Sequence, residues 1–320
     1  MTASSPAEDR RPAETTTATG DQWVIGHGHQ RAVITEVGAT LRSFTIEDRP
    51  VIDGFGPGEW SQGGRGQVLA PWPNRLGDGR YTFEETEAQA PLNEPSRHNA
   101  IHGLVRWMPW RMVSRAQNRV SMAFELHPSP AYPFPLRLAV EYRLGRDGLT
   151  VVADAENPGP TDLPFGVGFH PYITVGTPTV DLVRLRVPAD QRLIADDRGL
   201  PTGRGPVSGT EFDFNQGRLI GVTRLDTCYT SLNRDGDGRA RVDLDHPDAA
   251  GGATLWVDER FGYLMVYTGD TLEPARKRTS VAVEPMSCPP DALRSGTDLI
   301  VLRPRGRWTG SWGITVRPHS

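Results

Sequence analysis

Hydrophobic and polar residues alternate along much of the chain from about Trp23 onward. A period of two places successive side chains on opposite faces of a strand, so each such run predicts a half-buried β-strand. The clearest run comprises Leu136, Leu138, Val140, Tyr142 and Leu144. A second run lies just upstream and comprises Val120, Met122, Phe124 and Leu126. We expect these two runs to pair with each other as antiparallel strands.

Shorter runs extend the same pattern. Residues 183–187 and 312–316 alternate, and segments 32–37 and 41–46 flank Gly38-Ala39, which predicts a hairpin or a bulge. No comparable helical stripe exists in the sequence. The best helix candidate is "PPDALRSG", because prolines suit a first helical turn and Gly296 suits the stop. The predicted fold class is therefore all-β, with only fragments of helix.

Composition supports many short strands in one domain. Glycine and proline supply 35 and 28 of the 320 residues, without a repeat period. Turn-rich segments are spread evenly, so we expect a single domain over residues 21–320. Residues 1–20, "MTASSPAEDRRPAETTTATG", are polar and lack the apolar segment of a secretory signal, which predicts a disordered tail. No window approaches the roughly 18 apolar residues of a membrane span, so no membrane partner is expected.

Charge and cysteine content exclude further classes of protein. The net charge is -4 and basic residues are scattered, which argues against nucleic acid as a partner. Cys228 and Cys288 are too few for a disulfide framework, and no CxxC or HExxH spacing predicts a metal site. A reduced, cytoplasmic setting fits best. Neither cysteine sits at the start of a predicted helix or beside an obvious histidine, so we expect buried structural cysteines instead of a thiol nucleophile.

A single carboxylate stands inside the apolar run "VAVEP" at Glu284. Pro285 favours an extended Glu284 and is expected to end the strand there, at the rim of a sheet. A carboxyl group beside apolar bulk has a raised pKa and suits a general base. The alternative is a surface residue on an edge strand, because Glu-Pro also occurs at Glu94-Pro95 and Glu273-Pro274.

His170, in "PFGVGFHPY", is the candidate partner of Glu284. Gly166 and Gly168 allow close backbone approach, and Pro171 restrains the histidine to extended geometry. An imidazolium beside a carboxylate can act as an acid while the carboxylate acts as a base. The alternative is a purely structural histidine.

Four further polar residues could bind a ligand. Asn74 and Arg75, in "LAPWPNRLGDGRYTF", offer donors and an acceptor for hydroxyl or acidic oxygens, although Arg75 could instead cap backbone carbonyls. His102 precedes two tryptophans, at positions 107 and 110, which could stack on a sugar or simply fill the core. Asp226, in "RLDTCYTSL", could accept bonds from hydroxyl groups or lie at a solvated strand end.

The segments "APWPNRLGDGRYTF", "NAIHGL", "GFHPY", "LDTCYT" and "VAVEPMSCPPDAL", in this order, resemble the aldose 1-epimerase (galactose mutarotase) family over about residues 23–316. The resemblance implies a large antiparallel β-supersandwich of the galactose mutarotase type. It also implies that His170 is the general acid and Glu284 the general base. Asn74, Arg75, His102 and Asp226 are implied to bind the sugar, with no cofactor or metal.

Two segments depart from the family pattern. "GFHPYITVG" lacks an asparagine that often follows the His-Pro-Tyr-Phe segment, and "IHGLVRW" replaces a more usual His-Gly-Gly. The sequence therefore looks closer to a bacterial branch of the family whose sugar preference varies.

The implied function is interconversion of the α and β anomers of a free aldose, a small-molecule sugar. Two alternatives stay open from the residues alone. One is a non-catalytic carbohydrate-binding or sugar-sensing protein on the same fold. The other is a glycosidase, which normally uses two carboxylates, here Glu284 with Asp226. The sequence also leaves a homodimer open.

Overall fold

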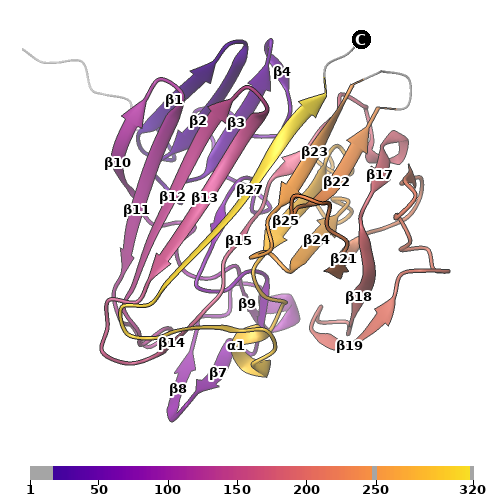
Figure 1. The fold of residues 1–320 in the computed structure, drawn as a ribbon. Coiled ribbons are helices and arrows are strands. Elements are labelled where there is room, and N and C mark those ends of the chain that lie inside the picture. The colour runs from indigo at the N-terminus through magenta and orange to yellow at the C-terminus, as the bar shows by residue number, and fades with distance from the viewer. Residues whose placement is uncertain (1–16, 247–250, 318–320) are drawn as a thin grey trace, which may run out of the picture.

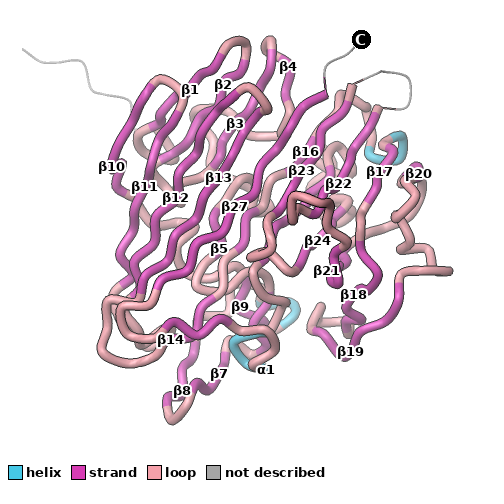
Figure 2. The backbone as a smooth tube through the Cα atoms, viewed as in Figure 1, coloured by secondary structure: helices cyan, strands magenta, loops and turns pink. Residues whose placement is uncertain are grey.

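The computed structural model describes residues 17–246 and 251–317, and most regular structure in them is β-strand (Figure 2). Two large antiparallel sheets form the body of the molecule (Figure 1). Among the described residues, no helix has the length and apolar character needed to span a membrane.

The nine-stranded sheet contains the longest strands. Its spatial order is β10 (Arg111–Ala116), β11 (Arg119–Leu126), β12 (Leu136–Gly145), β13 (Gly148–Glu156), β27 (Arg307–Arg317), β23 (Gly252–Val257), β22 (Ala240–Asp245), β17 (Arg184–Arg186) and β20 (Arg218–Leu219).

The eight-stranded sheet contains Asp226 and Glu284, and His170 lies between two of its strands. Its spatial order is β19 (Pro201–Pro206), β18 (Ala189–Ala195), β21 (Asp226–Leu232), β24 (Tyr263–Tyr267), β25 (Val281–Met286), β15 (Gly168–Phe169) and β5 (Val68–Leu69), and β16 (Tyr172–Ile173) also pairs with β25.

Smaller elements complete the described chain. A four-stranded sheet holds β1 (Gln22–His27), β2 (Gln30–Thr35), β3 (Leu41–Ile46) and β4 (Arg49–Pro50). Three strand pairs are β6 (Arg75–Gly77) with β9 (Asn99–Ile101), β7 (Arg80–Phe83) with β8 (Thr86–Gln89), and β14 (Leu163–Phe165) with β26 (Ile300–Leu302). The short helices are η1 (Pro95–Arg97), η2 (Val180–Leu182) and α1 (Ala292–Ser295).

The two large sheets pack against each other through apolar side chains. The ring of Phe169 on β15 lies 5.2 Å, centroid to centroid, from the ring of Trp312 on β27. Both rings are buried and belong to one contiguous hydrophobic core that draws on both sheets. The predicted fold class, an all-β antiparallel supersandwich with few short helices, is therefore confirmed.

The predicted strand pairs are also confirmed. β11 and β12 are antiparallel, with Val120 opposite Tyr142 and Met122 opposite Val140. The apolar residues of the two alternating runs are buried, except Phe124, which is partly buried against the core. β2 and β3 form the predicted hairpin around Gly38-Ala39, with a register shift at residues 33–34. Both turn residues have positive φ, which explains the glycine.

The helix expected at "PPDALRSG" is present as the single turn α1. It begins at Ala292 after Asp291, so the prolines precede the helix and do not occupy its first turn. Gly296 ends it in the left-handed conformation and donates its N–H to the carbonyl of Ala292, as a glycine stop requires.

Residues 1–16 of the expected tail lie outside the described residues. Residues 17–20, expected in the same tail, lie within the described chain and make backbone hydrogen bonds. The N–H of Gly20 donates to the carbonyl of Thr17, and the N–H of Val37 donates to the carbonyl of Thr19, whose side chain is buried. This pairing with the segment after β2 fixes them in place.

Candidate active site

One cavity of about 480 Å³ brings together all of the candidate site residues named from the sequence. They come from segments far apart in the chain, namely Asn74, Arg75, His102, His170, Asp226 and Glu284. The cavity opens beside the eight-stranded sheet, and the β6–β9 pair forms one of its walls.

Glu284 lies on β25, inside the sheet. The expectation that Pro285 ends this strand at the rim is wrong, because β25 continues to Met286 and pairs with β24 throughout. The proline is tolerated because its missing N–H falls between those of Val283 and Ser287, which donate to Pro171 and Val167. Between these two bonds, the neighbouring segment, residues 170–171, is not paired with β25 as a strand. Glu284 is thus a central residue with 2 % of its surface exposed.

His170 occupies that interruption, between β15 and β16. Its N–H donates to the carbonyl of Gln67, and its own carbonyl accepts from Gly66, so the backbone is fixed on both sides. Gly168 allows the close approach expected from the sequence, since a Cβ there would lie 2.7 Å from the Cβ of Pro73. The imidazole is 5 % exposed and points into the cavity.

The Nε2 atom of His170 lies 3.2 Å from Oε1 of Glu284. Burial raises the pKa of Glu284 well above its usual range, with Asp226 adding to the effect and Arg75 opposing it. Burial likewise lowers the pKa of His170 to about 3, with a further contribution from Arg65. Both shifts disfavour charge. The pocket therefore favours a neutral pair that shares one proton, and the two groups titrate together.

Asn74 and His102 form the next part of the wall. β6 pairs with β9, which places Arg75 opposite Ile101, and Asn74 and His102 sit at the ends of this short ladder with positive φ. The N–H of His102 donates to the carbonyl of Asn74. The rings of His102 and His170 meet edge to face at 5.3 Å, and burial lowers the pKa of His102 well below its usual value.

Arg75 and Asp226 both line the cavity and lie close to each other. Asp226 begins β21 and is partly exposed, and its Oδ2 lies 3.6 Å from Nη2 of Arg75. Glu94 accepts hydrogen bonds from Nε of Arg75 at 3.0 Å and from Nη2 at 3.1 Å. Asn99 donates to the same carboxylate at 2.8 Å. Arg75 is therefore held by side chains and does not cap backbone carbonyls, the alternative left open by the sequence.

Sequence reasoning missed several residues that line the cavity. Glu94 was noted only because it precedes a proline, as Glu284 does, yet it lines the cavity. Trp107 is 47 % exposed at the cavity, whereas Trp110 is buried in the core, so only the first can stack on a ligand. Arg97, Arg106 and Tyr172 also line the cavity. The β6–β9 pairing could have signalled Glu94, because it brings the segment before β9 beside Arg75.

Several buried polar atoms in the cavity have no hydrogen-bond partner among the described residues. They are Oε2 of Glu284, Nδ1 of His170 and Nδ1 of His102, together with Nε of Arg106. Buried polar groups are normally satisfied, so four unpaired atoms on residues that line one cavity are unusual. Together they offer both donors and acceptors, which is the chemistry that several hydroxyl groups require.

Metal and thiol chemistry find no support among the residues that the structure describes. No group of three or more His, Cys, Asp or Glu side chains is arranged to hold a metal ion there. Cys228 and Cys288 are free and buried, as expected, and burial raises the pKa of Cys288 to about 12. Neither thiol is therefore a ready nucleophile.

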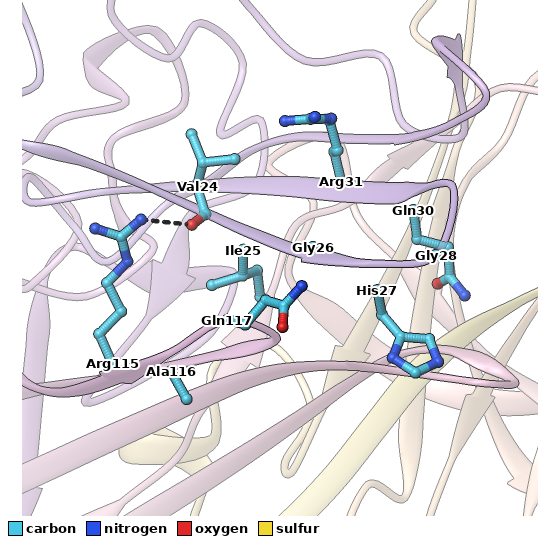
Figure 3. A pocket seen from close by; sticks show the side chains of 10 residues that line it. All are labelled: Val24, Ile25, Gly26, His27, Gly28, Gln30, Arg31, Arg115, Ala116 and Gln117. Atoms are coloured by element: carbon cyan, nitrogen blue, oxygen red, sulfur yellow. Dashed lines mark hydrogen bonds between the residues drawn. The ribbon is translucent and has the colours of Figure 1, made fainter.

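A second hollow lies between the β1–β2 hairpin and the β10–β11 turn (Figure 3). Its polar lining includes His27, Gln30, Arg31 and Arg115, and Arg115 donates to the carbonyl of Val24. No carboxylate lines it, so it offers no base to pair with His27. None of the predicted site residues lies there.

The sequence model of one protein family, described as aldose 1-epimerase, matches residues 21–315. The chain belongs to the aldose 1-epimerase family. This confirms the resemblance inferred from the five short segments.

Two curated proteins and one solved structure illustrate what the chain is similar to. The uncharacterized Escherichia coli protein YihR is 35 % identical over 87 % of both chains. Galactose mutarotase from Rattus norvegicus is 30 % identical over 78 % of this chain and 77 % of its own. The crystal structure of an aldose epimerase homologue from C. elegans superposes with a TM-score of 0.83 at 18 % identity, covering 94 % of this chain and 99 % of that one. The last comparison shows the shared fold.

Proposed function

We propose that the protein is an aldose 1-epimerase, which interconverts the α and β anomers of a free aldose by ring opening and reclosure. The observation that carries the proposal is the 3.2 Å contact between Nε2 of His170 and Oε1 of Glu284 in a buried pocket. Family membership and the rat galactose mutarotase relative support the reaction class. We also propose that the protein works in the cytoplasm.

The pair can supply an acid and a base without a proton from solvent. Transfer of the shared proton from Glu284 to His170 across their contact gives a carboxylate and an imidazolium. Glu284 then removes the proton from the anomeric hydroxyl while His170 donates its proton to the ring oxygen. The bond between the anomeric carbon and the ring oxygen breaks, and a carbonyl forms at that carbon. The pair returns to its neutral state.

Reclosure reverses these transfers. Rotation about the C1–C2 bond presents the other carbonyl face to the same hydroxyl. His170 takes the hydroxyl proton and Glu284 protonates the carbonyl oxygen, which gives the opposite anomer. One pair of groups therefore serves both directions, and each positioned proton-transfer group contributes about 10²- to 10⁴-fold.

The remaining predicted residues bind and orient the sugar. Asn74 and Asp226 offer acceptors for hydroxyl groups, and Arg75 and His102 offer donors that can steady negative charge as the ring opens. Trp107 gives an aromatic face at the cavity for the apolar face of a sugar ring.

Polarimetry on freshly dissolved α-anomers tests the proposal. The protein is expected to speed the approach to the equilibrium rotation for at least one aldose in a panel. His170→Asn and Glu284→Gln are each expected to lose most of that rate while remaining folded by circular dichroism. Near-normal rates in either variant would remove the acid/base assignment, and sugar binding without anomer exchange would instead identify a binding or sensing protein.

A further inference from the structure

Two side chains stack in series behind the imidazole of His170. The ring of Tyr172 lies parallel to the imidazole, 5.0 Å away between centroids and tilted by 12°. The guanidinium carbon of Arg65 lies 4.2 Å from the centroid of the Tyr172 ring. His170 therefore touches Glu284 through one nitrogen and rests on a tyrosine that is itself in contact with a cation.

Arg65 is buried to an unusual degree for an arginine. Only 2 % of its surface is exposed. Its Nη2 donates to Asp53 at 3.1 Å and its Nη1 donates to the carbonyl of Gln62 at 3.2 Å, while its Nε has no partner among the described residues. Burying a guanidinium is costly unless it is fully paired, so this incomplete pairing calls for an explanation beyond stability.

The loop that carries Arg65 also holds the stack in place. The hydroxyl of Tyr172 donates to the carbonyl of Gly63 at 2.9 Å. Gly64 lies against the imidazole so closely that a Cβ there would come within 2.5 Å of Cδ2 of His170. The imidazole is therefore clamped between this loop, Tyr172 and Glu284.

We propose that Arg65 is a positioning residue that acts on His170 through Tyr172, fixing the imidazole against Glu284 and opposing a positive charge on it. The fixed cation lies behind an aromatic ring and is almost fully buried, where charges interact more strongly than at the surface. Its effect is to make His170 a stronger acid toward the ring oxygen once it carries the shared proton.

Other charged or titratable groups also surround the pair. They are Glu284 on β25, Tyr172 on β16, His102 after β9, Arg106 in the loop that follows it, Arg75 on β6 and Asp226 on β21. None of them forms the ion pair of the buried arginine, because the ion-pair partner of Arg65 is Asp53, which is absent from the cavity lining.

Histidine NMR of the full-length protein tests the inference directly. The imidazole signals of His170 are identified by their loss in His170→Asn and followed from pH 8 to about pH 3, as far as each protein stays folded. In the wild type they are expected to stay those of a neutral ring until the pH approaches 3. In Arg65→Met the pKa of His170 is expected to rise by about one unit, so the ring should begin to charge about one pH unit higher, the effect of removing a nearby buried charge.

Arg276→Met is the matched control. Arg276 donates to the same Asp53 carboxylate at 2.5 Å but is partly exposed and does not line the sugar cavity. It is expected to leave the His170 titration unchanged. Equal shifts in Arg65→Met and Arg276→Met would overturn the inference, as would a wild-type His170 that titrates near pH 6.5, a result that needs no variant.

The pH dependence of the rate provides a second readout, and this part rests on the proposed function. Loss of the cation raises both pKa values of the coupled pair, so both limbs of the kcat/KM profile are expected to move to higher pH by about one unit in Arg65→Met. Arg65→Lys retains the charge and is expected to keep both limbs in place while the rate falls. A profile that moves in Arg65→Lys as far as in Arg65→Met contradicts the inference. If no sugar is epimerised, the proposed function fails and the NMR result still decides the role of Arg65.

Discussion

Glu284 lies directly opposite Met265 across strands β25 and β24. Met265 in turn pairs with Cys228 on β21, so an apolar row adjoins the carboxylate on one face of the sheet. Both neighbours are buried and neither offers a strong hydrogen bond. This row provides the low-polarity surroundings that raise the pKa of Glu284.

The raised pKa predicts how stability depends on pH. Below about pH 4.5 the carboxyl group is protonated in both the folded and the unfolded chain, so it causes no penalty. As the pH rises above 4.5, Glu284 loses its proton readily in the unfolded chain but not in the folded protein, where its pKa is raised. This favours the unfolded chain, so the free energy of unfolding falls. Glu284→Gln lacks this titration. Urea unfolding is expected to show that the variant gains stability over the wild type between pH 5 and pH 8.

His170 is expected to change the free energy of unfolding with pH in the opposite direction, in the same urea unfolding experiment. Its folded pKa of about 3 lies below the unfolded value, so its contribution is complete above about pH 6.5 and is lost as the pH falls. His170→Asn is therefore expected to gain relative stability toward acid. A difference between Glu284→Gln and the wild type that does not change with pH would show that the carboxyl group is not perturbed.

Catalysis should depend on which Glu-Pro glutamate is changed. Glu284→Gln removes the base and is expected to lower the epimerisation rate by about 10²- to 10⁴-fold. Glu273→Gln is the control, because Glu273 also precedes a proline but is exposed. It is expected to retain the wild-type rate in polarimetry. Equal rates in the two variants would mean that Glu284 takes no part in proton transfer.

Glu94 is expected to matter through Arg75. Glu94→Ala removes the carboxylate that holds Nε and Nη2 of Arg75, so the guanidinium can move onto Asp226. We expect KM to rise about tenfold, or about 1.4 kcal/mol of lost binding, with a smaller change in kcat. Steady-state kinetics measure both.

Two comparisons sharpen this prediction. Asp78→Asn alters a carboxylate that pairs with Arg198 and Arg294 but not with Arg75, and it should leave KM unchanged. In a double-mutant cycle, Glu94→Ala should cost little when Arg75→Ala is already present. Full additivity would show that Glu94 acts independently of Arg75.

Gly64 is expected to tolerate no side chain. Gly64→Ala would place a Cβ 2.5 Å from Cδ2 of His170 at a φ of +79°, so the clash is expected to disturb the alignment of the imidazole with Glu284. The rate is expected to fall at least tenfold, about the effect of losing one aligned proton donor. Gly58→Ala, where a Cβ meets nothing within 4 Å, is the control and should be fully active. An active Gly64→Ala protein would show that the imidazole position is not critical.

Trp107 and Trp110 should separate binding from folding. Trp110 is buried, so Trp110→Ala is expected to lower the free energy of unfolding by about 3–5 kcal/mol. Trp107 is 47 % exposed at the cavity, so Trp107→Ala should change stability by less than about 0.5 kcal/mol and weaken sugar binding. Urea unfolding and fluorescence titration measure the two effects. Unchanged binding in Trp107→Ala would exclude stacking.

Strand positions followed from local pattern alone. The alternating runs of β11 and β12 specify both the strands and their pairing, because a one-residue slip would turn every apolar side chain toward water. The hairpin at Gly38-Ala39 and the stop at Gly296 follow from backbone conformations that glycine adopts readily. Strand ends were harder to predict, since Pro285 looked like a stop.

By itself, the sequence determined which strands form, which residue types are available for proton transfer, and the family to which they belong. Only the tertiary structure decided which glutamate meets which histidine, because that contact joins β25 to the interruption between β15 and β16. At this interruption no backbone carbonyl needs a donor from residue 285, so a proline, which lacks an N–H, fits there. Local pattern carries no information about such gaps, since they arise from pairing between segments more than a hundred residues apart.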